Sequence, residues 1–106
     1  MYQLSATVAF ALFAVAVAFP QAQPRESELA VNPVYKEHCA KCHGKTAEGR
    51  HFGGPSLISE KVASASTEDL RNIITDGKGR MPKFASKLTP DQIDALVHQI
   101  QTLNKK

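Results

Sequence analysis

Apolar residues recur at helical spacing in the second half of the chain, and nowhere do they alternate with polar residues as they do in β-strands. The segment 67–76 carries its apolar residues on one side of a predicted helix, which Thr67 caps and Gly77 ends. A longer helix is predicted over 89–103, because its Thr-Pro-Asp-Gln start is typical of a capping box and apolar residues follow along one face. The pattern predicts an all-α protein of three or more helices.

The first half of the chain predicts one further helix, followed by a loop. Asn32 is a typical cap and Pro33 suits a first turn, so a helix is expected from Pro33 to His43, with Gly44 at its end. The segments 45–60 and 77–88 are predicted to be irregular. Structureless connections above about 12 residues are uncommon unless they serve a site, so these loops are expected to wrap a ligand. The side chains expected in the core or against that ligand are Val34, Leu57, Leu70, Ile73, Ile74, Phe84, Leu88, Ile93, Leu96, Val97 and Ile100.

An uncharged apolar run, Ala6 to Phe19, lies near the start of the chain. It has the length of a signal-peptide core and is shorter than the roughly 20 residues of a membrane-spanning helix. We expect cleavage after Ala22, although no Lys or Arg precedes the run. The predicted organisation is an export signal over 1–22, a flexible lead-in over 23–32 and one domain over 33–106. An uncleaved leader would instead anchor the protein to a membrane.

Removal of the leader would leave about 84 residues without tryptophan, a size at which a hydrophobic core is marginal unless something staples it. A disulfide between Cys39 and Cys42 would close a very short loop and would stabilise little. The formal net charge of +3 is mild and does not suggest nucleic-acid binding. A metal or a large prosthetic group is therefore expected.

The segment His38–Lys45, HCAKCHGK, holds the residues that bear on this group. On the predicted helix, Cys39, Cys42 and His43 fall at i, i+3 and i+4 and share one face. A thioredoxin-like thiol pair would need a preceding strand and a βαβ setting, which the pattern lacks. A structural zinc ion would need a fourth ligand at a spacing unlike the usual two-pair arrangement. The candidates for that ligand are His38, His51 and His98.

A C-x-x-C-H pattern also carries the groups that covalent haem attachment requires. Two thiols can add across the two vinyl groups of the porphyrin, and the histidine beside the second thiol can ligate the iron. Export agrees with this interpretation, because c-type haem is attached outside the cytoplasm in bacteria. The motif favours haem bound through Cys39 and Cys42, with His43 as an iron ligand, over the thiol pair and the zinc site.

At these positions the chain resembles the class I, mono-haem c-type cytochromes. The resemblance covers 33–103 through CAKCH at 39–43, GGPSL at 53–57, GRMPKF at 79–84 and the closing helix at 89–103. It implies a cytochrome c fold, with three to four helices wrapped round one haem c that is thioether-linked to Cys39 and Cys42. It also implies one-electron transfer as the function, with no enzyme activity.

The resemblance further implies the second iron ligand. Met81 is the only methionine after the leader, it precedes Pro82 in an irregular segment, and in the family the methionine of this pair is the axial ligand. A soft thioether favours ferrous iron and raises the reduction potential. Pro55 aligns with the proline whose carbonyl accepts a hydrogen bond from the proximal histidine, here His43. Three other histidines are weaker candidates. His38 shares the predicted helix that holds the two cysteines, and His51 lies in the loop just beyond it. His98 is expected to face solvent.

Basic residues surround the proposed ligand. The segment 77–90 contains four cations and no acid: Lys78, Arg80, Lys83 and Lys87. They form either an ordinary solvated face or a rim that steers acidic redox partners. We expect a monomeric periplasmic carrier that meets redox partner proteins with acidic docking surfaces, and that contacts a membrane only if the leader is uncleaved. The alternatives are a haem sensor or peroxide-reactive module with a displaceable Met81, and a small electron-accepting subunit of a dehydrogenase or oxidase.

Overall fold

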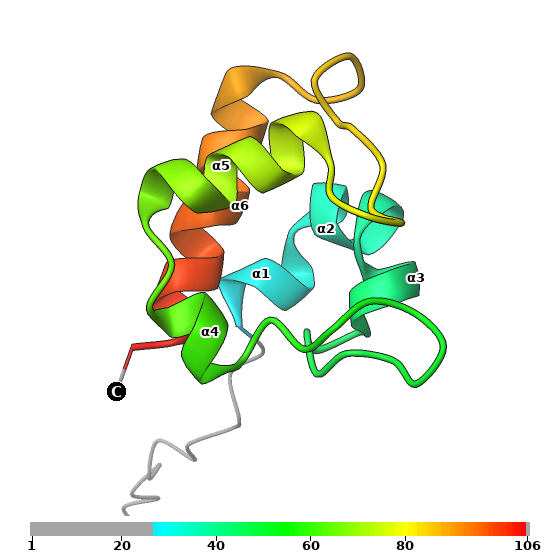
Figure 1. The fold of residues 1–106 in the computed structure, drawn as a ribbon, viewed down its shortest axis with the longest axis vertical. Coiled ribbons are helices and arrows are strands. Elements are labelled where there is room, and N and C mark those ends of the chain that lie inside the picture. Colours follow the sequence, from blue (N-terminus) through cyan, green and yellow to red (C-terminus); the bar gives the residue numbers. More distant parts are fainter. Residues whose placement is uncertain (1–26, 106) are drawn as a thin grey trace, which may run out of the picture.

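The computed structural model describes residues 27–105, and in this range the chain is helical, with no strand beyond one isolated bridge between Lys78 and Met81 (Figure 1). The all-α prediction is confirmed. The expected export signal over 1–22 and the first part of the lead-in lie outside the described residues. The helices, in chain order, are α1 (Glu28–Val31), α2 (Pro33–His38), α3 (Ala40–His43), α4 (Glu60–Ala63), α5 (Thr67–Asp76) and α6 (Pro90–Leu103).

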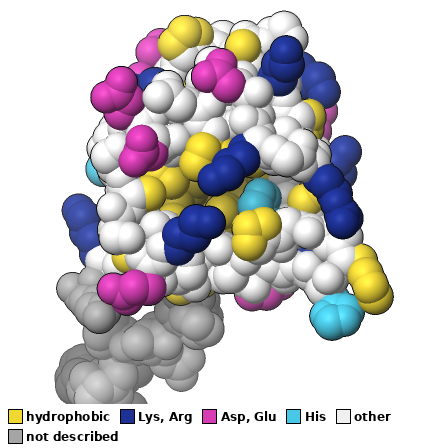
Figure 2. All heavy atoms as spheres, viewed as in Figure 1, with side chains coloured by type: hydrophobic (Ala, Val, Ile, Leu, Met, Phe, Trp, Pro, Cys, Tyr) yellow, Lys and Arg dark blue, Asp and Glu magenta, His cyan; other side chains and the backbone are white. Residues whose placement is uncertain are grey.

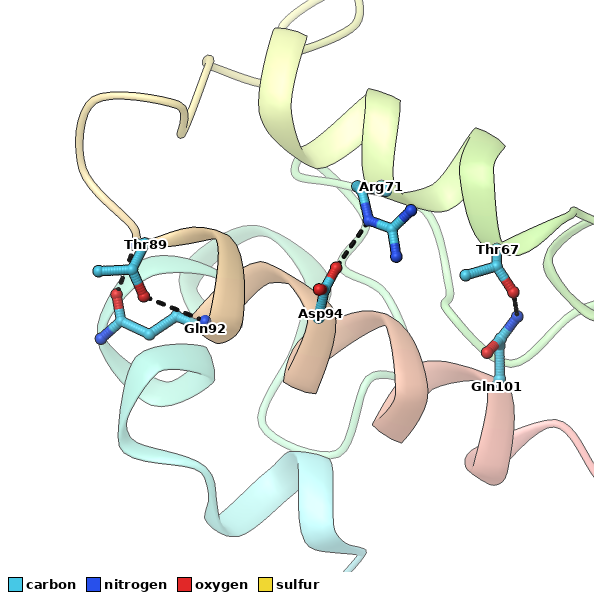
Figure 3. Close-up of polar contacts among 6 residues, drawn as sticks. All are labelled: Thr67, Arg71, Thr89, Gln92, Asp94 and Gln101. Carbon is cyan, nitrogen blue, oxygen red and sulfur yellow. Dashed lines mark hydrogen bonds and ion pairs between the residues drawn. The ribbon is translucent and has the colours of Figure 1, made fainter.

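Local capping explains where the two long helices begin. The Thr89 side chain accepts from the backbone N–H of Gln92, and the Gln92 side chain accepts from the backbone N–H of Thr89, so the capping box of α6 is confirmed (Figure 3). Helix α5 ends at Gly77 as predicted, but its cap is Ser66 and not Thr67. Thr67 instead accepts a hydrogen bond from Gln101 of α6.

Helices α5 and α6 pack against each other and form one side of the molecule (Figure 1). Two side-chain contacts join them besides their apolar faces: Arg71 Nε lies 2.6 Å from Asp94 Oδ1, and Gln101 Nε2 lies 2.8 Å from Thr67 Oγ1 (Figure 3). Helix α1 also packs on α6, and α2 packs on α1 and α3. Helix α6 is therefore the element that α5 and α1 share.

The short helices differ from the sequence-based expectation in three places. Residues 28–31 were expected in a flexible lead-in but form α1, because Ser27 caps the turn and Leu29 is only 1% exposed in the core. The helix expected from Pro33 to His43 is interrupted at Cys39, which ends α2 and begins α3. The loop expected over 45–60 is followed directly by α4, a single turn that Ser59 caps.

The core contains most of the apolar residues that the pattern selected. Eight of them are buried, namely Leu70, Ile74, Phe84, Leu88, Ile93, Leu96, Val97 and Ile100. Val34, Leu57 and Ile73 are only half-buried. Tyr35 and Leu29, each 1% exposed, complete the core from the side of α1 and α2. Within 27–105, none of the helices has the length and apolar character needed to cross a membrane.

Candidate functional site

The C-x-x-C-H residues lie at the junction of α2 and α3, on a single turn of backbone. The carbonyl of Cys39 accepts from the N–H of Cys42 at 3.2 Å and from that of His43 at 2.9 Å. Both cysteines are free and half-buried. Burial, with a smaller contribution from Cys42, raises the pKa of the Cys39 thiol to about 11. Because a redox thiol pair needs a low-pKa thiolate, this environment argues against that interpretation of the motif.

His43 is held in one orientation at the C-terminal end of α3. The residue is 9% exposed, and Nδ1 lies 2.8 Å from the carbonyl oxygen of Pro55. A proline carbonyl can only accept, so Nδ1 carries the proton and Nε2 keeps a free lone pair. Gly54 lies so close that an added Cβ would stand 2.9 Å from Nδ1 of the ring. A free Nε2 on a fixed ring is the arrangement that an iron ligand requires.

The loop that carries Pro55 is fastened to the cysteine turn. Gly54 N–H donates to the Cys42 carbonyl at 2.7 Å, and Gly49 N–H donates to the His43 carbonyl at 2.6 Å. Gly49 has a φ of 85° and no room for a side chain, since an added Cβ would lie 2.6 Å from the backbone nitrogen of Ser56. The backbone of this loop thus fixes the position of the carbonyl that orients His43.

Tyr35 and Glu48 brace the same turn from either side. The buried Tyr35 hydroxyl donates to the Gly44 carbonyl at 2.5 Å, and burial raises the pKa of Tyr35 from its ordinary value of 10.0 to about 12. The Glu48 carboxylate accepts from the backbone N–H and the hydroxyl of Thr46, and the hydroxyl contact is the main cause of its lowered pKa. The sequence analysis did not select Tyr35, although its spacing four residues before Cys39 places it on the same side of the helix.

Met81 lies in a tight turn of the 77–88 segment. Its N–H donates to the Lys78 carbonyl at 2.9 Å, and its carbonyl accepts from the Lys78 N–H at 3.2 Å. Gly79, with a φ of 57°, allows the chain to reverse between them. Met81 is half-buried and packs against the hydrophobic core.

The other histidines stand apart from one another. His98 is exposed, as expected, and so is His51, whose ring contacts the exposed Phe52. His38 is half-buried on α2. In the described part of the chain, no three His, Cys, Asp or Glu side chains come together as metal ligands would. The zinc interpretation of the motif therefore lacks a ligand set in the described residues.

The surface has a hollow on the side where α1, α2 and α3 face the end of α5. Figure 2 shows hydrophobic side chains on its floor, a histidine among them, and Lys and Arg side chains around its edge. Lys78, Arg80, Lys83 and Lys87 are all exposed. Haem c is flat, apolar and thiol-reactive, and the residues described above offer it two free thiols, a half-buried thioether and an imidazole nitrogen.

Known proteins match this chain over the segment that contains these residues. Residues 28–99 match the family described as cytochrome c oxidase, cbb3-type, subunit III. A cytochrome c6 from Gloeothece citriformis (strain PCC 7424) is 32% identical over 71 residues, which cover 58% of this chain and 57% of that protein. The chain therefore spans little more than half the length of that relative.

Two further matches come from an enzyme and from a solved structure. The dihydro-heme d1 dehydrogenase of Pseudomonas aeruginosa is 36% identical over 67 residues, which cover 60% of this chain but only 13% of the enzyme. The crystal structure of cytochrome c6C from Synechococcus sp. PCC 7002 superposes with a TM-score of 0.58 at 27% identity, and covers 67% of this chain and 89% of that one. The similarity therefore covers most of a small cytochrome and a short part of a large enzyme.

Proposed function

Because this chain is a mono-haem c-type cytochrome and belongs to the family described as cytochrome c oxidase, cbb3-type, subunit III, we propose that it carries single electrons outside the cytoplasm and has no catalysis of its own. Its similarity to cytochrome c6 supports a soluble periplasmic carrier. The 2.8 Å contact between His43 Nδ1 and the Pro55 carbonyl is the observation that carries the proposal, because it leaves Nε2 free to bind iron.

Two thioether bonds would hold haem c to Cys39 and Cys42, and bound haem would supply the iron that changes oxidation state. His43 would donate through Nε2, and its hydrogen bond to Pro55 would increase the donor strength of the ring. Met81 would supply a soft thioether, which favours ferrous iron and raises the reduction potential. Apolar side chains around the group would disfavour the additional charge of the ferric state. Because two protein side chains would hold the iron, small molecules would find no open site on it.

The ligand assignment is tested by Met81→Ala. We expect the variant to keep covalent haem, to lose the weak thioether-to-iron absorption band in the far red, and to bind carbon monoxide when reduced. Its midpoint potential should fall by more than about 59 mV, which corresponds to a tenfold change in the redox equilibrium. An optical redox titration measures both effects.

The matched control is Leu103→Ala, which also removes a partly buried apolar side chain but lies at the end of α6. It should leave the far-red band and the potential as in the wild type. A Met81→Ala protein with the wild-type spectrum and potential would show that Met81 is not the ligand. A wild-type protein that binds carbon monoxide readily would instead favour the gas-sensing or peroxide-reactive alternative.

The segment 77–88, which carries the proposed ligand Met81, is called the ligand segment. The exposed cations on it support partners with acidic docking surfaces. Lys78, Arg80, Lys83 and Lys87 would steer such partners without holding them tightly. The second-order rate of electron transfer to an acidic redox protein should therefore fall steeply as ionic strength rises, and charge reversal at Lys83 should weaken that dependence. A rate that does not change with salt would remove this part of the proposal.

A second function is favoured by two of the matched descriptions, which name an oxidase subunit and a dehydrogenase. In that role the chain would accept electrons as a small subunit of a larger enzyme. Tagged protein purified from its native host separates the two functions, because a free carrier elutes alone as a monomer and a subunit elutes with the enzyme at a fixed ratio.

A further inference from the structure

A contact between two aromatic rings links the attachment helix to the segment that carries Met81. His38, the last residue of α2, stands with its ring centroid 5.8 Å from that of Phe84, at an interplanar angle of 75°. Edge-to-face pairs at this distance are favourable beyond the apolar area that they bury. The His38 side chain is 27% exposed and Phe84 is 4% exposed, so the contact is largely shielded from water.

Phe84 is one of the residues that anchor segment 77–88, which carries Met81, to the rest of the fold. Its N–H donates to the Ile74 carbonyl of α5 at 3.1 Å, and its own carbonyl accepts from the N–H of Leu88 at 2.9 Å. The ammonium group of Lys87 lies 5.7 Å from the centre of the Phe84 ring. Phe84 stands three residues after Met81 in the same irregular segment, 77–88, so its contacts help to place that segment.

The contact between His38 and Phe84 lies between two parts of the fold, the α5–α6 side and the α2–α3 side. Helix α5 packs chiefly on α6, and α2 packs on α1 and α3. The Met81 segment follows α5 and is hydrogen-bonded to it at Phe84 and Ala85, whereas Cys39 and His43 belong to the α2–α3 side. The His38–Phe84 pair joins these two sides directly.

We propose that His38 is a positioning residue for Met81, and that the near-perpendicular contact of its ring with Phe84 holds the ligand segment (77–88) at the distance from α2 and α3 that thioether ligation requires. This inference rests on the proposed haem function and adds a residue that neither ligates iron nor bonds to haem. The Glu37 carboxylate, 3.9 Å from Nε2 of His38, lies on an exposed side chain and is not needed for the ring contact.

Exogenous imidazole provides the test, because it competes with the Met81 thioether for ferric iron. We expect His38→Ala holoprotein to bind imidazole about two- to tenfold more tightly than the wild type, the range that one aromatic pair contributes. Its far-red thioether band should also disappear at lower imidazole concentration. His38→Phe keeps an aromatic edge toward Phe84 and should restore the wild-type affinity.

The control is His98→Ala, which removes an exposed histidine from α6 and should leave imidazole affinity unchanged. If His38→Ala does not accumulate as holoprotein, His38→Leu makes the same comparison, because it keeps apolar volume and lacks the ring edge. Wild-type affinity in His38→Ala or His38→Leu, or failure of His38→Phe to restore it, would overturn the inference. A far-red band that persists in Met81→Ala would instead overturn the ligand assignment itself, whatever His38 does.

Discussion

The His43 ring is constrained by its neighbours in a way that a sequence motif does not specify. The Pro55 carbonyl sets the tautomer through Nδ1, and Gly54 leaves no space for a side chain between the loop and the ring. Both constraints come from one loop, in which the backbone N–H of Gly54 donates a hydrogen bond to the carbonyl of Cys42. The ring of His43 and Cys42, the proposed iron ligand and one of the two proposed thioether residues, are therefore fixed relative to each other by a single set of hydrogen bonds.

The buried hydroxyl of Tyr35 should contribute to stability in a way that depends on pH. Its raised pKa means that the fold favours the neutral phenol, which donates to the Gly44 carbonyl. This contribution to stability is present below pH 10 and is lost as the pH rises through about 12. Tyr35→Phe should lower the free energy of unfolding by about 1 kcal/mol at pH 8. Denaturant titrations of the holoprotein should find that the two proteins converge between pH 10 and about 12, whereas a constant difference over that range would contradict this role for the hydroxyl.

The motif residues were accessible to sequence analysis because their chemistry is local. Cys39, Cys42 and His43 share a turn, and the structure keeps them on one even though Cys39 interrupts the helix. The contact of Pro55 with His43 was expected from the resemblance and is present in the structure. The contact between His38 and Phe84 was not predicted, because it joins residues far apart in sequence through the packing of separate elements.

At the scale of elements, the capping box of α6 and the glycine that ends α5 were predicted correctly, whereas the serine caps of three other helices were not: Ser27, Ser59 and Ser66. The Thr89–Gln92 box and Gly77 fixed the start of α6 and the end of α5. Helices α1 and α4 were missed because each has only four residues, too few to display a helical period. Helix α1 depends on burial of Leu29 against the rest of the core, which no local pattern encodes.

Gly77 lies close to the backbone of Met81. Gly77 has a φ of 77°, and an added Cβ would lie 2.6 Å from the Met81 carbonyl oxygen. Gly77→Ala should therefore displace Met81, weaken the far-red thioether band and cost about 1–3 kcal/mol beyond the penalty for the left-handed backbone.

Gly79→Ala is the matched control, because its φ is 57° and nothing lies within 4 Å of an added Cβ. It should cost only the backbone penalty of about 1–2 kcal/mol and keep the band. Chemical denaturation and the far-red spectrum measure the two effects. Equal loss of the band in both variants would mean that the approach of Gly77 to Met81 does not position the ligand.

At the scale of the whole molecule, buried apolar residues from α1, α2, α5, α6 and the segment before α6 form one core cluster, and further apolar side chains are exposed beside it (Figure 2). Helices α5 and α6 pack against each other, α1 packs on α6, and α2 packs on α1 and α3 (Figure 1). A domain of this size has little core to spare, so a flat apolar group in the hollow would supply the missing contact surface. The cofactor would then be part of the fold as well as the redox centre.

Covalent attachment of one haem to Cys39 and Cys42 can be read from the mass of the intact protein under denaturing conditions. We expect the mass of the polypeptide plus one haem, with colour that stays on the protein in acidified organic solvent. Replacement of both cysteines by alanine should remove that added mass. A purified wild-type protein with the mass of the polypeptide alone, or one that releases its pigment into the solvent, would contradict the account.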